Sequence, residues 1–346
     1  MENTENSKIR IWHDRSNCIT EGFPQYTENF TDVQLEHMWT AREIRVEDDK
    51  HSIMTDMSEA ERYGVMSTLS LFTNYEVFAG KEYWTNRFLQ IVKGPEFEAM
   101  GVTFGSVELA VHKPFYQKIN KVFNLDNEEF YSAFTKDPVL AERMECISNI
   151  VDHKNDLISL GGFSMVEGAI LYSAFAFLRS FQANGKSKIK KTVAGNTLSA
   201  MDEGLHSMAG ATVFRHLTKE CLEDGIYEER YGKQEDVEAE LYKLARLIRE
   251  HEHLICERIF EKGEIDGVTV EDLKAFVDHR LNEVLVSLGL EPIFEVTNNN
   301  IADWFYKSIT SFTMIDFFNA TGAQYVRSWN EEDFVFEPEE NQEGIE

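Results

Sequence analysis

The chain has 346 residues, of which 42% are hydrophobic and 12% aromatic, a composition that excludes a disordered protein and allows a large core. Its net charge of −27 argues against a nucleic-acid partner, because the phosphate backbone attracts clustered lysines and arginines. Four widely spaced cysteines without a CxxC pair, and an N-terminus that lacks the regions of a signal peptide, indicate a cytoplasmic protein.

Along the chain, the apolar residues recur with the period of an α-helix, and strand-like alternation is scarce. The first helical segment opens with Ser58 and Glu61, the residue pair of a capping box. No internal repeat or linker interrupts the pattern, which predicts one all-α domain over residues 1–329 and an acidic, flexible tail over 330–346. We expect helices over residues 58–92, 104–123, 137–160, 161–183, 194–222, 236–263 and 269–290.

The apolar run from Gly161 to Leu178 is the only stretch that approaches a membrane span. It is marginal in length, contains Glu167, and lacks aromatic and basic residues at both ends, so a buried core helix is the better interpretation and no membrane contact is expected. An unpaired buried carboxylate is costly. Glu167 must therefore be neutralised, paired or bound to a metal.

Other segments place polar residues in similarly apolar surroundings. Glu203 and His206 are three residues apart, and Glu108 and His112 are four apart, so each pair shares one face of its helix. Glu76 lies alone in "LFTNYEVFAG". A pair with the same spacing, at positions 250 and 253, lies in the strongly charged "REHEHLICER" and indicates a solvated face instead.

Each of these residues alone is more often an ordinary core or half-exposed group. Together they place four carboxylates on apolar faces with no matching lysine or arginine, and divalent cations are the obvious compensation. A four-helix bundle that holds two metal ions between carboxylates, with one histidine each, requires this set of side chains. The predicted metal ligands are Glu76, Glu108, His112, Glu167, Glu203 and His206.

Four motifs resemble the radical-generating small subunit of class I ribonucleotide reductase, a ferritin-like helical bundle. They are "HMWTAREI", "ELAVHKPFY", "VEGAILYSAFAF" and "MDEGLH", and the C-terminal segments "HRLNEVLVSLGL" and "ADWFYKSITSFTMIDFFNATGAQY" are also similar to the family. The resemblance implies that a dimetal centre and oxygen generate a radical on Tyr116. It also implies a hydrogen-bonded chain through Trp39, Asp202 and His112 that passes the radical outward.

The same resemblance implies partners and a metal pair. The radical would pass to a large subunit that reduces ribonucleotides to deoxyribonucleotides, and the small subunit would form a homodimer. Iron is the expected metal, with manganese–iron and dimanganese pairs as alternatives. Glu76 stands where the family usually has aspartate, as in manganese/iron members, but those members lack the tyrosine that this chain has at Tyr116.

The spacing of Glu108 and His112 departs from the Glu-x-x-His of the family by one extra residue, and Pro114 follows within the same turn. Proline cannot donate to the carbonyl four residues before it. A widened turn, or π-bulge, absorbs one inserted residue and allows both side chains to face the metals. We therefore predict such a turn between Ser106 and Phe115.

The tail departs from the family in lacking a tyrosine beyond Tyr325. Either Tyr325 or Trp329 would then relay the radical to the large subunit, while Phe334 and Phe336 resemble anchors for a groove on that partner. The polarity of this tail predicts disorder in the isolated subunit.

Two other functions remain open from the sequence. A ferritin-like dimetal oxidase or oxygenase would act on its own substrate in a cavity of the bundle, without the Trp39 chain or a docking tail. A ferritin-like iron-binding protein would need no redox partner. A stable tyrosyl radical that hydroxyurea quenches separates the reductase interpretation from both.

Overall fold

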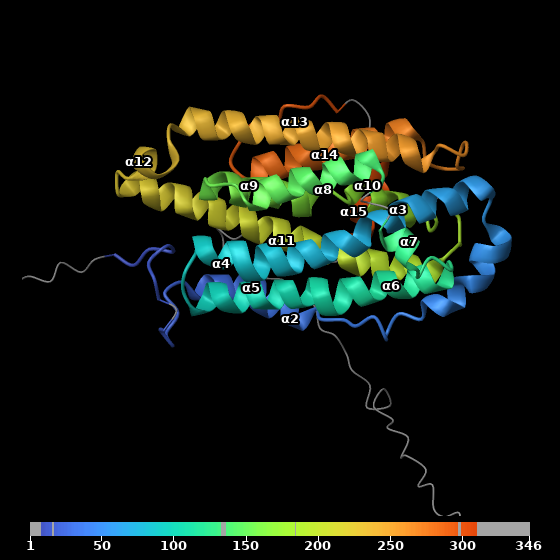
Figure 1. Ribbon diagram of the computed structural model, residues 1–346, viewed down its shortest axis with the longest axis horizontal. Helices are drawn as coiled ribbons and strands as arrows, with labels where there is room; N and C mark the ends of the chain where they lie inside the picture. The colour runs from blue at the N-terminus through green and yellow to red at the C-terminus, as the bar shows by residue number, and fades with distance from the viewer. Residues whose placement is uncertain (1–7, 16, 133–135, 184, 297–298, 310–346) are drawn as a thin grey trace, which may run out of the picture.

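The computed structural model describes residues 8–15, 17–132, 136–183, 185–296 and 299–309, and these form helices without a β-strand (Figure 1). The prediction of an all-α fold is confirmed. The α-helices are α1 (Pro24–Tyr26), α2 (Asp32–Glu36), α3 (Glu59–Phe78), α4 (Phe88–Ile91), α5 (Pro95–Val107), α6 (Lys113–Val122), α7 (Glu128–Tyr131), α8 (Pro138–Val151), α9 (Asp156–Ala169), α10 (Tyr172–Ser180), α11 (Lys190–Glu223), α12 (Tyr227–Tyr231), α13 (Gln234–Ile259), α14 (Val270–Ser287) and α15 (Asn300–Ile309). Short 3₁₀ or π segments are η1 (Thr27–Thr31), η2 (Val46–Asp49), η3 (Ser52–Asp56), η4 (Ala79–Arg87) and η5 (Glu108–His112).

The long helices run approximately along the longest axis of the molecule, with α13 on one edge, α5 and α6 on the opposite edge, and α9 and α11 between them (Figure 1). One cluster of buried apolar side chains extends from Ile11 to Phe305. The division into a domain over 1–329 and a tail over 330–346 stays a prediction, because residues 310–346 lie outside the described part of the chain.

Side chains that accept hydrogen bonds from free backbone amides define several helix starts. The predicted capping box is present, since the Ser58 hydroxyl accepts from the Glu61 amide and the Glu61 carboxylate accepts from the Ser58 amide. At α11 the acceptor comes from a distant segment, because Asp49 accepts from the amides of Lys191 and Thr192. This bond ties the N-terminal half of the chain to the longest helix of the bundle.

Two predicted helix boundaries are wrong. The segment over 137–160 is not one helix, because α8 ends at Val151 and Asn155 caps the start of α9 by accepting from the Leu157 amide. The segment over 161–183 is also divided, into α9 and α10. The second division has its cause in the backbone conformation of Ile170 and Leu171.

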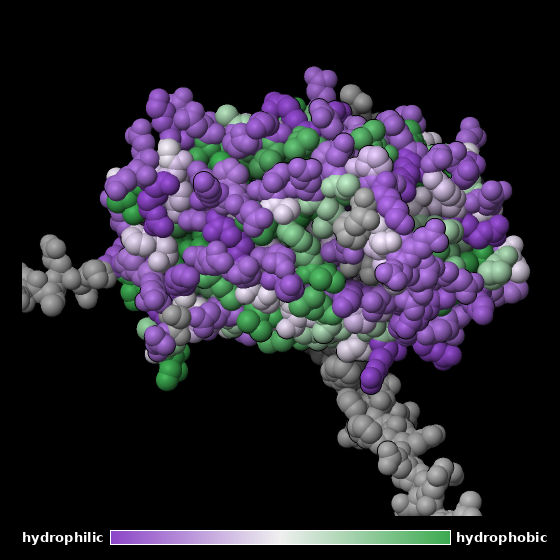
Figure 2. All heavy atoms as spheres, in the orientation of Figure 1, coloured by the Kyte–Doolittle hydropathy of each residue, from purple (hydrophilic) through white to green (hydrophobic). Residues whose placement is uncertain are grey.

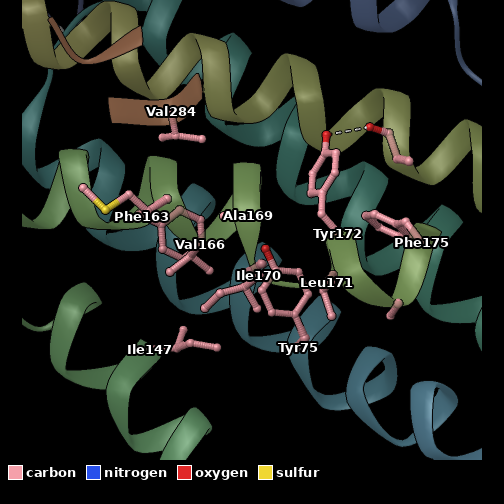
Figure 3. Close-up of a cluster of buried hydrophobic side chains, with 14 of the residues drawn as sticks. Tyr75, Ile147, Phe163, Val166, Ala169, Ile170, Leu171, Tyr172, Phe175 and Val284 are labelled. Atoms are coloured by element: carbon pink, nitrogen blue, oxygen red, sulfur yellow. Dashed lines mark hydrogen bonds between the residues drawn. The ribbon is translucent and has the colours of Figure 1, made fainter. Parts of the chain in front are cut away.

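Between α9 and α10 the chain leaves the helical conformation within the core. Ile170 is extended, and Leu171 has a positive φ of 72°, which is rare for a residue other than glycine. Arg280 of α14 donates to the Gly168 carbonyl at 2.9 Å. The Tyr172 hydroxyl donates to the Ala200 carbonyl of α11 at 3.0 Å, the dashed line in Figure 3. Neighbouring helices therefore hold the backbone where α9 and α10 break.

The stretch Asp156–Ser180 is long and apolar enough to cross a membrane, yet its most apolar window is buried throughout within the bundle. This agrees with the expected core helix, although the helix is broken. The face of the molecule in Figure 2 is covered mainly by hydrophilic side chains, with smaller apolar areas between them. The most apolar segment of the described chain therefore lies within the bundle.

Candidate metal centre

Four separate helical runs bring the six predicted metal ligands together in the core. All six side chains are at most 1% exposed. The first group is Glu76, Glu108, His112 and Glu203, and the second is Glu108, Glu167, Glu203 and His206. Within each group, one potential ligand atom per residue lies within 4.8 Å of all the others. Because the groups share Glu108 and Glu203, the arrangement has two adjacent positions for cations with two carboxylates between them.

The predicted widened turn is confirmed at the point where α5 continues into α6. Residues Glu108–His112 form the π-helical segment η5, and the Lys113 amide donates to the Glu108 carbonyl, five residues back. The turn absorbs the extra residue between Glu108 and His112, so that His112 Nδ1 lies 3.0 Å from Glu108 Oε2. The unusual spacing therefore keeps both side chains on one face.

A second π-helical segment, η4, packs against the same ligand. A Cβ added at Gly80 of η4 would lie 2.9 Å from the Cβ of Glu108 and 3.0 Å from the Gly105 carbonyl oxygen. A Cβ added at Gly105 would lie 2.9 Å from the Gly80 carbonyl oxygen. The two backbones approach this closely because neither glycine has a side chain.

His112 has a different role for each of its ring nitrogens. Its Nε2 is hydrogen-bonded to Asp202 Oδ2 at 3.0 Å. Its Nδ1 faces the carboxylates, at 3.0 Å from Glu108, 3.4 Å from Glu203 and 3.5 Å from Glu76. A hydrogen bond at one nitrogen fixes which nitrogen is free to bind a metal. Nδ1 is therefore the atom of His112 that can coordinate.

His206 repeats this arrangement with a residue that the sequence reasoning missed. Its Nε2 is hydrogen-bonded to Gln34 Oε1 at 3.1 Å, while its Nδ1 lies 2.9 Å from Glu108 and 3.4 Å from Glu203. Gln34 also donates to Asp202 Oδ1 at 2.9 Å. Gln34 thus connects His206 to Asp202, which is the partner of His112. No spacing in the sequence singles Gln34 out.

The chain of hydrogen bonds expected between Trp39, Asp202 and His112 is present. The Trp39 indole donates to Asp202 Oδ2 at 2.8 Å, and the same oxygen is hydrogen-bonded to His112 Nε2. Trp39 is 3% exposed, so the path from the cluster toward it runs through buried groups. Its function in radical transfer stays a prediction.

Glu167 is held by two aromatic donors that the sequence reasoning also missed. The Tyr75 hydroxyl donates to Oε2 at 2.8 Å, and the Trp84 indole donates to Oε1 at 2.7 Å. Figure 3 shows Tyr75 beside Ile170 and Leu171, where α9 and α10 break. Nothing in the sequence distinguishes Tyr75 and Trp84 from ordinary core aromatics.

Tyr116 is fully buried one turn beyond His112. Its ring stacks on Phe72 with 4.1 Å between centroids, and Phe175 stacks on Phe72 in turn at 5.4 Å. Burial raises the pKa of Tyr116 well above its ordinary value, and the nearby Glu76 raises it further. The phenol is therefore protonated at neutral pH.

Whether cations fit this cluster can be judged by comparison with other buried carboxylates. Glu96 pairs with Arg15, Glu252 pairs with Arg143 at 2.6 Å, and Glu61 pairs with Lys188 at 2.7 Å. In the described residues, none of the four carboxylates of the cluster has a lysine or arginine partner. Both oxygens of Glu76 and Glu203 also lack a hydrogen bond there. Buried carboxylate oxygens without a basic partner or a hydrogen bond are suited to binding divalent cations.

The pKa shifts within the cluster also favour the binding of cations. Burial and the Glu108 carboxylate raise the pKa of Glu76, and burial and the Glu203 carboxylate raise the pKa of Glu167. Burial alone would lower the pKa of His206, but hydrogen bonding to Glu108 and Glu203 raises it to about 9. Without cations the cluster therefore retains protons, which metal binding would displace.

The comparisons with known proteins agree with this geometry. The sequence profile of the family "Ribonucleotide reductase, small chain" matches residues 24–300, a segment that contains the whole cluster. The chain is 23% identical over 344 residues to 048L of Invertebrate iridescent virus 3, which is named as a ribonucleoside-diphosphate reductase small subunit, and the alignment covers 93% of this chain and 87% of that protein. It is 21% identical over 323 residues to the ribonucleoside-diphosphate reductase small chain of Neurospora crassa, with 86% and 73% covered.

A solved structure shows the same fold. The dimanganese(II)-NrdF of Streptococcus sanguinis superimposes with a TM-score of 0.71 at 20% identity, covering 86% of this chain and 99% of that chain. At this identity the match establishes the architecture, which is the ferritin-like bundle expected from the sequence. It leaves the roles of individual side chains to be argued from their own geometry.

Proposed function

This chain belongs to the ribonucleotide reductase small-chain family and is the small subunit of a ribonucleoside-diphosphate reductase, and from this premise we propose that its buried cluster holds two metal ions beside a radical-forming tyrosine. The bound metals would supply, with oxygen, the oxidising power that no side chain has. The observation that carries the proposal is the convergence of four buried carboxylates and two histidines without a lysine or arginine among them.

The two groups of side chains support an assignment of ligands. Glu76 and His112 would bind one metal ion, and Glu167 and His206 the other. Glu108 and Glu203, which belong to both groups, would lie between the ions. Each histidine would coordinate through Nδ1, because its Nε2 is already hydrogen-bonded to Asp202 or Gln34.

The donor set fits iron or manganese, which accept carboxylates together with imidazole. The metal pair that we propose is two iron ions, with manganese–iron and dimanganese pairs as alternatives. Glu76 in place of the usual aspartate and the dimanganese relative favour the manganese alternatives. Tyr116 favours a radical on the protein.

For Tyr116 we propose the role of radical site, and for Trp39 and Asp202 that of the outward path. When Trp39 gives up an electron toward the Tyr116 radical, its indole proton can move to Asp202 Oδ2 along the hydrogen bond, whose nitrogen–oxygen distance is 2.8 Å. The same carboxylate oxygen contacts His112, so the path begins at a predicted metal ligand. Phe72 and the surrounding core exclude water from Tyr116, which would protect a radical there.

The partners follow from the family. A small subunit implies a large subunit that binds the ribonucleotide, and we propose a homodimer of small subunits in the cytoplasm. The tail over 330–346, with Phe334 and Phe336, would dock on the large subunit, and Tyr325 or Trp329 would relay the radical. These residues lie outside the described part of the chain.

Radical spectroscopy tests the proposal. The protein is loaded anaerobically with Fe(II) or Mn(II), oxidised, and studied by electron paramagnetic resonance, with Tyr116→Phe and Tyr83→Phe as matched variants. Tyr83 is also buried, and, as for Tyr116, no hydrogen bond to its hydroxyl is found in the described structure. We expect a hydroxyurea-sensitive tyrosyl signal in the wild type and in Tyr83→Phe, and none in Tyr116→Phe.

Turnover completes the test. The wild type with the large subunit should reduce ribonucleotides, and Tyr116→Phe should lose this activity. A radical that survives in Tyr116→Phe would place it on another side chain. Metal binding without a radical or ribonucleotide reduction would favour a dimetal oxidase that acts on its own substrate.

A further inference from the structure

The pair of donors to Glu167 is a feature of the site that the family motifs do not predict. Tyr75 is the residue before Glu76, near the end of α3, and Trp84 lies in η4. Both are buried, and each donates to a different oxygen of Glu167. We infer that Tyr75 and Trp84 are positioning residues, which fix the Glu167 carboxylate for the metal ion that it would share with His206.

The geometry of a carboxylate explains how two donors can orient Glu167 and still allow it to bind a metal ion. An ionised carboxylate has about four lone-pair positions on its two oxygens. One donor on each oxygen fixes the plane and rotation of the group and still leaves each oxygen a lone pair for a cation. Partners of this kind orient metal ligands, and their loss typically lowers metal affinity about 10- to 100-fold.

The two donors act on one position of the centre. Glu167 belongs to the group with His206 and is absent from the group with Glu76 and His112. His112 and His206 have their own partners, Asp202 and Gln34. Removing a donor to Glu167 should therefore weaken one of the two metal-binding steps and leave the other unchanged.

The chain offers a matched control in the neighbouring tyrosine. Tyr83 is as buried as Tyr75 and lies beside Trp84, with its ring stacked on Phe163 at 3.5 Å. Within the described residues its hydroxyl has no hydrogen-bond partner. Tyr75→Phe and Tyr83→Phe thus make the same chemical change in the same core, and only the first removes a donor to Glu167.

The two binding steps can be measured without oxidation chemistry by titrating the protein with Mn(II) under anaerobic conditions. The electron paramagnetic resonance signal of free Mn(II) reports how much of the metal remains unbound. Glu167→Ala identifies the step to which Glu167 contributes. We expect Tyr75→Phe and Trp84→Phe to weaken that same step by at least about 10-fold, while the other step changes by less than about twofold. Tyr83→Phe should match the wild type in both steps. Circular dichroism and melting temperature check the fold of each variant.

The inference rests on the proposed dimetal site, and the outcomes separate the two. A wild-type protein that does not bind two Mn(II) ions would overturn the dimetal site itself. Two ions in the wild type with unchanged steps in Tyr75→Phe would overturn only the positioning role. Tighter binding in Tyr75→Phe would also overturn it, because the donor would then compete with the metal for Glu167. An equal loss at both steps would indicate a general structural effect and contradict the assignment.

Discussion

Glu167 shows how individual side chains can stabilise a carboxylate in an otherwise apolar helix. Its two oxygens accept hydrogen bonds from Tyr75 and Trp84, which offset part of the cost of burial. Burial and the neighbouring Glu203 nevertheless raise its pKa. The remaining cost is what a bound cation would remove.

Replacing Glu167 with alanine should therefore affect metal binding more than folding. The variant removes a buried charge and leaves two donors without an acceptor, and these effects oppose one another, with a net change within about 1–3 kcal/mol in the free energy of unfolding. We expect loss of one of the two Mn(II) ions in calorimetric titration and a metal-free protein that still unfolds cooperatively. An unfolded variant, or one that retains both ions, would contradict this prediction.

Asp202 provides a second test at the level of single residues. Asp202→Asn keeps a side chain that can accept from Trp39, but an amide cannot take the indole proton as a carboxylate does. We expect the Tyr116 radical to form, and ribonucleotide reduction with the large subunit to fall by at least about 100-fold. Full turnover in a variant with a normal radical yield would show that the path does not use Asp202.

The predicted ligands could be found from the sequence because each is a polar residue in an apolar segment. Such conflicts between residue type and surroundings are visible without a structure. Three of their hydrogen-bonding partners were missed for the opposite reason. Gln34, Tyr75 and Trp84 do not conflict with their surroundings, and they reach the cluster through contacts between residues far apart in the chain.

At the level of elements, two π-helical segments shape the surroundings of Glu108 and His112. The segment η5 absorbs the extra residue before His112, and η4 packs its Gly80 against Gly105. The sequence predicted η5 because the family spacing and Pro114 both indicated it. It gave no such signal for η4, whose wide turns depend on packing against α5.

Gly105→Ala tests this close approach. The added methyl group would lie 2.5 Å from Thr85 Cγ2 and 2.9 Å from the Gly80 carbonyl oxygen, so the helices must separate. We expect a loss of about 1–3 kcal/mol in the free energy of unfolding. Gly204→Ala on α11 is the control, since its methyl group would meet only the Tyr172 hydroxyl, at 3.4 Å, and alanine favours a helix. Equal stability of the two variants would show that the glycine contact is not tight.

The break between α9 and α10 could not be predicted from local sequence. Leu171 has no intrinsic preference for a positive φ, and neither Ile170 nor Leu171 is a glycine or proline. Arg280 and Ala200, more than 25 positions away in the chain, supply the hydrogen bonds that hold the backbone there. Periodicity therefore predicted a helix at this place but not its interruption.

At the scale of the whole molecule, the bundle brings four carboxylates into one place while pairing its other buried glutamates with basic side chains. Glu96 and Glu252 have arginine partners on other elements, and Glu61 has Lys188. The all-α class followed from helical periodicity, and the convergence of four helices on one point was inferred from buried carboxylates without matching basic residues. The structure shows that convergence directly. The docking of the tail stays a prediction, since residues 310–346 lie outside the described part of the chain.

The central claim is that these six side chains hold two metal ions, and anomalous diffraction from crystals loaded anaerobically with Mn(II) tests it most directly. We expect two strong peaks within the cluster, one beside His112 Nδ1 and Glu76, the other beside His206 Nδ1 and Glu167, with Glu108 and Glu203 between them. A single peak, or peaks only outside this cluster, would contradict the account.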